Sequence, residues 1–244
     1  MSDPILNPLP RLEARAHAGS TAFEVGPRDT WDLSALVEEV AQRLGDGRPS
    51  TSDIEISGMF FGSAPGMSLA PATVRRLADA GTSLLISLRT PDTGVVGRDA
   101  PTDFKNRDRT TTSASFRLRG LFEPDAFSSK VGLTPTKTSR REDRRRLMAR
   151  VSTWRIELGP AVAREFPTSM IDELLDSLLP HAPAIRTAVA ELGVRSAVTF
   201  AARYGDVVPK LALSHERIAG IAELACWLDF SIMVVRETED ALEF

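Results

Sequence analysis

Residues 54–88 read IEISGMFFGSAPGMSLAPATVRRLADAGTSLLISL, and residues 198–232 read VTFAARYGDVVPKLALSHERIAGIAELACWLDFSI. The two stretches align without a gap. The identical pairs include Pro65 with Pro209, Leu69 with Leu213, Ala78 with Ala222, Leu84 with Leu228 and Ser87 with Ser231. Because similar residues follow in the same order in both stretches, the sequence predicts two copies of one structural unit.

Each stretch has the pattern of a strand, a second strand, a helix and a closing strand. Ile54 and Ile56 alternate with polar residues, as in a half-buried strand. Leu69 ends the second strand, and Pro71 stands where a helix begins, because the first helical residue needs no backbone N–H. Gly81 ends that helix, and an apolar run follows as the closing strand.

Matching segments also precede the two stretches. Residues 23–26 (FEVG) match residues 156–159 (IELG), and each segment predicts a short strand. Apolar residues at helical spacing predict a helix over residues 33–44. The corresponding helical stretch of the second copy, residues 169–192, is longer, and two prolines break it.

The second copy has a beginning for which the first copy shows no counterpart. Residues 115–119 alternate as a strand, and Pro124 opens a short helix that carries Phe127 and Val131. We therefore expect a truncated first repeat and a complete second repeat. The expected boundaries are residues 1–90 for the first repeat, 91–112 for a linker, 113–237 for the second repeat and 238–244 for a tail.

Short strands interleaved with helices predict an α+β protein. Each of the two tandem copies is expected to be a small antiparallel sheet with helices on one face. This arrangement is similar to a ferredoxin-like plan with an extra strand. The sequence leaves open whether the two sheets join edge to edge or pack face to face.

The composition of this 244-residue chain is that of a globular protein, with 42% hydrophobic and 26% charged residues. Its apolar runs are too short to span a bilayer, and residues 1–10 contain three prolines and no basic segment of a secretory signal. The single cysteine, Cys226, fits a reducing compartment, so we expect a cytoplasmic protein. The net charge of −3 argues against nucleic acid as a partner, although residues 99–150 alone carry a net charge of +6.

Several motifs of the second copy resemble a known family. They are Phe122-Glu123-Pro124-Asp125, Val131-Gly132-Leu133-Thr134-Pro135-Thr136, Trp154 in a strand, Leu192-Gly193 and Leu211-Ala212-Leu213-Ser214. Together they are similar to the bacterial domain-of-unknown-function family 4279, over residues 113–237 and more weakly over residues 5–90. The resemblance implies a small α+β domain and no established chemistry.

The strongest local signal is a basic stretch between residues 137 and 150. It consists of Lys137, Arg140, Arg141, Arg144, Arg145, Arg146 and Arg150. One interpretation is a solvated surface with no partner. The other is a docking surface for an acidic partner or for a phosphate backbone, because arginine side chains bind paired oxygen atoms well.

Other candidate residues are aromatic. Phe60 and Phe61 in the first copy, and Tyr204 in the second, stand in the loop between two predicted strands. They form either a recognition loop or a turn with buried rings. Trp154 is expected to be a core residue, as are Leu213, Ile221 and Phe230.

The sequence contains no pattern that predicts catalysis. His17, His181 and His215 lie far apart, no cluster has the spacing of metal ligands, and the glycines do not form a phosphate loop, so we expect no metal and no cofactor. We therefore favour a non-enzymatic bacterial binding protein that recognises another protein, by analogy an immunity or conflict-system accessory protein. The alternative is an enzyme or small-molecule binder with its site between the two repeats.

Overall fold

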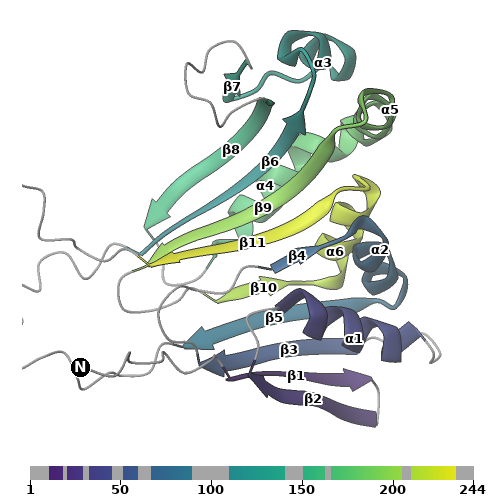
Figure 1. The fold of residues 1–244 in the computed structure, drawn as a ribbon, viewed down its shortest axis with the longest axis vertical. Coiled ribbons are helices and arrows are strands. Elements are labelled where there is room, and N and C mark those ends of the chain that lie inside the picture. The colour runs from purple at the N-terminus through teal and green to yellow at the C-terminus, as the bar shows by residue number, and fades with distance from the viewer. Residues whose placement is uncertain are drawn as a thin grey trace, which may run out of the picture.

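The computed structural model describes residues 11–18, 21–29, 33–45, 52–59, 67–89, 110–140, 151–162, 166–204 and 210–234. These residues form an α+β structure with two sheets, as the sequence predicts (Figure 1). We call residues 11–89 the first half and residues 110–234 the second half. Thr111 and Thr112, which the sequence assigns to the end of the linker, belong to a strand, so this strand begins before the expected boundary. The expected tail lies outside the described residues.

Sheet A has five strands in the order β10-β5-β3-β1-β2. Its strands are β1 (Arg11–Ala18), β2 (Thr21–Asp29), β3 (Ser52–Met59), β5 (Thr82–Arg89) and β10 (Leu211–Leu213). Sheet B has six strands in the order β4-β11-β9-β6-β8-β7. Its strands are β4 (Met67–Leu69), β6 (Thr111–Gly120), β7 (Lys137–Ser139), β8 (Ser152–Val162), β9 (Arg195–Tyr204) and β11 (Trp227–Val234).

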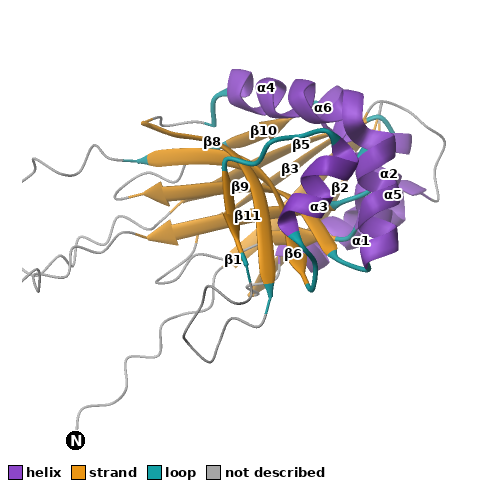
Figure 2. Cartoon of the chain, turned by 90° about the horizontal axis from the view of Figure 1, so that it is seen from above, coloured by secondary structure: helices purple, strands orange, loops and turns teal. Residues whose placement is uncertain are grey.

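The helices gather on one side of the strands (Figure 2). They are α1 (Leu33–Gly45), α2 (Pro71–Asp79), α3 (Pro124–Val131), α4 (Thr168–Leu178), α5 (Ala182–Leu192) and α6 (His215–Glu223), with a short 3-10 turn, Leu179–His181, between α4 and α5. The expected helix starts at Pro71 and Pro124 are confirmed, and the expected break between α4 and α5 occurs at the two prolines. Among the described residues, no helix combines the length and the apolar character needed to cross a bilayer.

The two halves exchange a short strand. β4 comes from the first half but pairs with β11 in sheet B, and β10 comes from the second half but pairs with β5 in sheet A. Leu69 lies opposite Leu228, and Leu213 lies opposite Leu84. The repeat offset of 144 residues makes Leu69 equivalent to Leu213 and Leu84 equivalent to Leu228, so the exchange is reciprocal and follows a pseudo-twofold axis. In Figure 1, β4 and β10 lie between β11 and β5, so the sheets meet edge to edge.

The expectation that the first half lacks the opening strand is wrong. β1 pairs with β2 and β3 as β6 pairs with β8 and β9, so β1 is the counterpart of β6. The alternation of β1 is hard to recognise in its sequence, RLEARAHA, because Ala16 and Ala18 occupy the places of Phe116 and Leu118 in β6. The two halves differ in the segment that follows the opening strand. In the first half two residues, 19–20, join β1 to β2, whereas in the second half α3 and β7 lie between β6 and β8.

The sheets are mixed rather than antiparallel, which corrects the ferredoxin-like expectation. β3 runs parallel to β5, and β9 runs parallel to β11. The reason is the crossover between each pair of strands. After β3 the chain adds β4 to the other sheet and returns through α2, and after β9 it does the same through β10 and α6. A helical crossover brings the chain back in its original direction.

One hydrophobic core runs through both halves. Leu69, Ile86, Trp154, Phe200 and Leu213 all belong to the same cluster of buried side chains. The expected burial of Trp154, Leu213, Ile221 and Phe230 is confirmed, since each is at most 1% exposed. The helices α2 and α6 pack against each other across the pseudo-twofold axis. Their contact includes Arg75, which donates to the carbonyl oxygen of Ala222 at 2.8 Å and to the carboxylate of Glu223 at 3.1 Å.

Candidate functional site

The face of sheet B that points away from the core carries arginines. On β6, Phe116 and Leu118 are fully buried in the core, and Arg117 and Arg119 are exposed on the opposite face. This alternation follows from the pleat of a strand, which turns successive side chains to opposite faces. Strands β8 and β9 carry further arginines on this open face, so the feature extends across the sheet.

The strand register brings these cations together. Arg117 lies opposite Arg155 of β8, and Arg155 lies opposite Lys137 of β7. Arg119 lies opposite Arg195 of β9. Arg203 stands further along β9, opposite Thr111. We call this set the basic face: Arg117, Arg119, Lys137, Arg155, Arg195 and Arg203. Directly opposed like charges destabilise a sheet, so the arrangement needs compensation.

Asp229 of β11 supplies much of that compensation. Its carboxylate accepts from Arg117 at 3.0 Å, from Arg195 at 3.0 Å and from the hydroxyl of Ser68 at 2.6 Å. Arg195 also donates to the Ser68 hydroxyl oxygen at 2.7 Å and lies 4.1 Å from the ring centroid of Trp227. Asp229 is only 7% exposed, so its charge is held by these partners rather than by water. Because Ser68 belongs to β4, the first half helps to hold the basic face.

A second carboxylate, Glu157 of β8, accepts from Arg155 at 2.6 Å. The backbone around this pair is held by Thr136, whose hydroxyl oxygen accepts from the N–H of Glu157 at 2.9 Å. Thr136 is the last residue of the Gly132–Thr136 turn, so this turn helps to position the backbone of β8. Within the described residues, Arg119, Lys137 and Arg203 have no ion-pair partner. The basic face therefore keeps an excess of positive charge.

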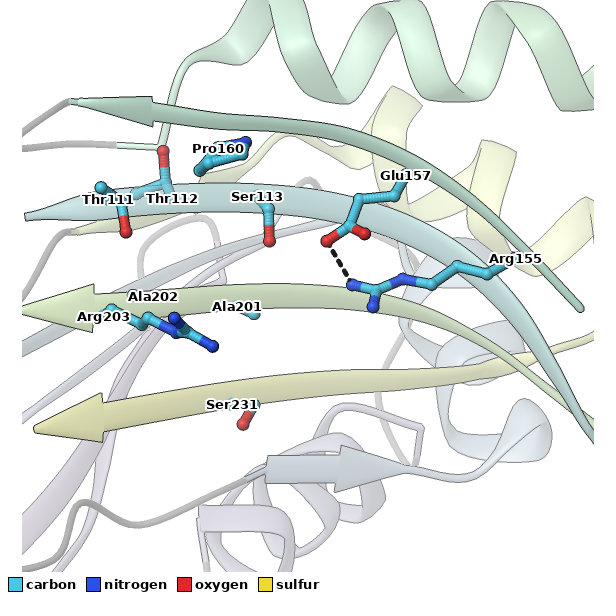
Figure 3. A pocket seen from close by; sticks show the side chains of 10 residues that line it. All are labelled: Thr111, Thr112, Ser113, Arg155, Glu157, Pro160, Ala201, Ala202, Arg203 and Ser231. Carbon is cyan, nitrogen blue, oxygen red and sulfur yellow. Dashed lines mark hydrogen bonds and ion pairs between the residues drawn. The ribbon is translucent and has the colours of Figure 1, made fainter. Parts of the chain in front are cut away.

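A hollow of about 340 Å³ lies beside the basic face (Figure 3). Its cause is a row of small residues in register on three adjacent strands: Ser113 opposite Ala201, and Ala201 beside Ser231. Arg203 and Thr111 stand at one end of the row, and Arg155 with Glu157 at the other (Figure 3). Pro160 forms part of the wall on the β8 side.

Pro160 takes its place because β8 contains a bulge. The register of β6 and β8 shifts between Thr112 and Ala114, and Gly159 within this irregularity has a φ of +95°. A Cβ atom at Gly159 would lie 2.9 Å from the carbonyl oxygen of Thr112, so glycine suits the position. Bulges commonly redirect side chains beside binding sites. The first half has the same shift between Leu12 and Ala14.

The sequence-predicted site residues are only partly described. Lys137 belongs to the basic face. Arg140 is exposed and forms an ion pair with Asp125 of α3. Tyr204 ends β9, and only its backbone is described. The remaining predicted residues lie outside the described ones: Phe60, Phe61, Arg141, Arg144, Arg145, Arg146 and Arg150.

The strand arginines are not among the residues predicted from the sequence, although Lys137 beside them is. Their signal is present in the sequence, because Arg117, Arg119 and Arg155 each alternate with large apolar residues. What the sequence does not give is the register that places them side by side. Likewise, the Gly-Pro pairs at residues 26–27 and 159–160 mark the two bulges, and a comparison of the copies could have found them.

The single cysteine and two of the histidines make contacts within the fold. Cys226 lies in the turn after α6, and burial raises the pKa of its thiol to about 12. A thiol that stays protonated at neutral pH is a poor nucleophile. His181 Nδ1 lies 2.8 Å from the carbonyl oxygen of Val131, and His215 lies beside Glu216 on α6. Across the described part of the chain, no three His, Cys, Asp or Glu side chains gather as a metal site would require.

A family model described as Domain of unknown function (DUF4279) matches residues 109–235. The chain belongs to the DUF4279 family. The matched DUF4279 segment spans β6 to β11, and it therefore contains the whole basic face and the hollow. It contains β10, which lies in sheet A, and it leaves out β4, which completes sheet B. The comparisons found no match among curated proteins or among solved structures.

Proposed function

We propose that this DUF4279 protein is a non-enzymatic binding protein that recognises an acidic surface of another protein through the basic face. The observation that carries the proposal is the excess of cations in register on an open sheet face. Among the residues that the structure describes, this face carries six cations and two carboxylates, and both carboxylates are already engaged. A fold that needed this face only for stability would gain nothing from opposed like charges.

The chemistry of the face supports a carboxylate-bearing partner. Guanidinium groups bind carboxylates through two parallel hydrogen bonds, and arginine is enriched in protein interfaces. A single exposed ion pair contributes at most about 1 kcal/mol, so several pairs must form together. Arg119, Lys137 and Arg203, on three different strands, can do so at once. Charge complementarity of this kind favours rapid association and selects against basic partners.

Nucleic acid has less support as the partner. Proteins that bind single strands combine a basic groove with aromatic rings on which bases stack. Trp227 is on the open face, but Arg195 covers its ring at 4.1 Å from the centroid. The alternative of a site between the repeats also has less support, because the described residues that line the hollow all belong to the second half. The narrower expectation of an immunity or conflict-system protein stays a prediction.

The test compares two charge-reversal variants of the full chain as baits in a lysate of the native host. One variant, Arg119→Glu/Arg203→Glu, changes the basic face. The matched control, Arg76→Glu/Lys210→Glu, changes two exposed cations outside it. We expect the proteins that the wild type retains to be lost from the first variant and kept by the control, and retention to fall with added salt. Both variants should melt at the wild-type temperature. Equal retention by the two variants would contradict the proposal.

A further inference from the structure

The hollow has a charge that matches one particular kind of group. The charged residues that line it are Arg155, Arg203 and Glu157. Arg155 is engaged by Glu157 at 2.6 Å, so this pair is neutral as a unit. Arg203 has no ion-pair partner among the described residues and projects along the hollow from β9 (Figure 3). The lining therefore carries one uncompensated positive charge.

A single positive charge is the complement of a monoanion. A carboxylate carries one negative charge and fits the guanidinium fork. A phosphate monoester carries about −1.5 to −2 at neutral pH, and its excess charge would face the carboxylate of Glu157. The lining thus favours a carboxylate over a phosphate.

The neutral lining residues suit the same ligand. The hydroxyls of Thr111, Ser113 and Ser231 can each donate to a carboxylate oxygen, and they come from two strands on either side of Ala201. Ala201 has only a methyl group as its side chain, so it leaves space at the bottom of the hollow. The ring of Pro160 offers an apolar wall for the methylene groups of an acidic side chain. The volume exceeds that of a carboxylate alone, so the rest of the residue also has room.

We infer that the hollow is the specificity pocket of the basic face, in which Arg203 binds the carboxylate of one glutamate or aspartate side chain of the partner protein. This inference rests on the proposed function and names the group that the partner must present. Arg119 and Lys137 then contact the surrounding acidic surface, and Arg203 fixes the register of the complex.

The experiment is an NMR titration of the isotope-labelled full chain in a chloride buffer. The probe is N-acetyl-glutamate N-methylamide, with the glutamine analogue and the phosphoserine analogue as comparisons. We expect saturable shifts of the Arg203 Nε–H and of the Ser113, Ala201 and Ser231 amides with the glutamate probe. The glutamine analogue should bind at least roughly tenfold more weakly, as the loss of a charge-assisted hydrogen bond requires.

Two variants make the test decisive. Arg203→Gln should weaken the binding of the glutamate probe by roughly tenfold or more, and Arg76→Gln, at an exposed cation outside the basic face, should leave that binding unchanged. Equal binding of the glutamine analogue, tighter binding of the phosphoserine analogue, or no effect of Arg203→Gln would each overturn the inference. If the probe result is negative while the Arg119→Glu/Arg203→Glu bait still loses its partner, only the pocket assignment fails. If that bait loses nothing, the proposed function fails.

Discussion

At the scale of single residues, one position shows how two similar halves acquire different surfaces. Asp229 and Ser68 are partners across β11 and β4, and the equivalent partners across β5 and β10 are Leu85 and Ala212. In sheet B this pair is polar and holds Arg117 and Arg195. In sheet A the same pair is apolar and can hold no cation. The backbone is therefore common to both halves, whereas the basic face belongs to one.

Trp154 is the residue whose removal should destabilise the second half most clearly. It is fully buried, its ring lies 5.0 Å from that of Phe127 and 6.2 Å from that of Phe116, and its Nε1 donates to the Ser128 hydroxyl at 2.8 Å. We expect Trp154→Ala to lower the free energy of unfolding by about 3–5 kcal/mol, because it leaves a large cavity. Urea denaturation followed by circular dichroism measures this.

Trp154→Phe serves as the control for that substitution. It keeps a ring in the cavity and gives up only the indole N–H bond, so its cost should be clearly smaller than that of alanine. A loss below about 1 kcal/mol for Trp154→Ala would show that the indole is not a core residue.

At the scale of elements, the sequence predicts what each segment forms but not where it goes. Pro71 and Pro124 begin helices as expected, and the alternation in residues 115–119 lies within β6. The exchange of β4 and β10 could not be predicted. Leu69 and Leu213 are equivalent, so the same register serves whether a strand pairs within its own half or across. The parallel pairing of β3 with β5 and of β9 with β11 comes instead from the helical crossover between the two strands, so the prediction of antiparallel sheets was wrong.

The exchange makes a specific prediction about hydrogen exchange. Leu69 and Leu213 are both buried, and each pairs with a strand of the other half. Leu69→Ala should therefore raise amide exchange in β11, and Leu213→Ala should raise it in β5, with each variant losing about 2–5 kcal/mol of stability. Mass spectrometry of peptides from the full chain measures both effects. If Leu69→Ala affected β5 and spared β11, the strands would pair within their own halves.

For the candidate site, too, the sequence predicts some of the residues but not how they are arranged in space. The sequence identified Lys137 through a run of charge, and it contains the alternating arginines of β6 and β8. It could not identify their assembly, because Arg117, Arg155 and Arg195 come from three strands whose neighbours are fixed by topology. The hollow is harder still to foresee, since it depends on small residues that coincide across β6, β9 and β11.

At the scale of the whole molecule, the two halves form one interlocked body. Each sheet takes an edge strand from the other half, α2 packs on α6, and one core joins them. Arg186 of α5 also donates to the carbonyl oxygen of Glu223 at 2.6 Å, beside the contacts of Arg75 from the first half. Hydrogen bonding to Arg75 lowers the pKa of the Glu223 carboxyl, so the carboxylate of this contact is protonated at a lower pH than that of an unpaired glutamate. The DUF4279 segment without β4 would leave β11 as an open edge, which is a site for unwanted pairing.

The interlocked arrangement predicts that the halves associate without a covalent link. We expect residues 1–95 and 105–244, expressed together as two chains with a tag on the first, to purify as a one-to-one complex. The reason is that β4 completes sheet B and β10 completes sheet A, so each chain offers an edge that the other fills. Size-exclusion chromatography with light scattering measures the complex. The matched control carries Leu69→Pro and Leu213→Pro, which remove backbone donors from both exchanged strands and should abolish co-purification. Co-purification that survives both prolines would show that the helices and core hold the halves together without the exchange, and separate elution of the unmodified chains would refute the interlock itself.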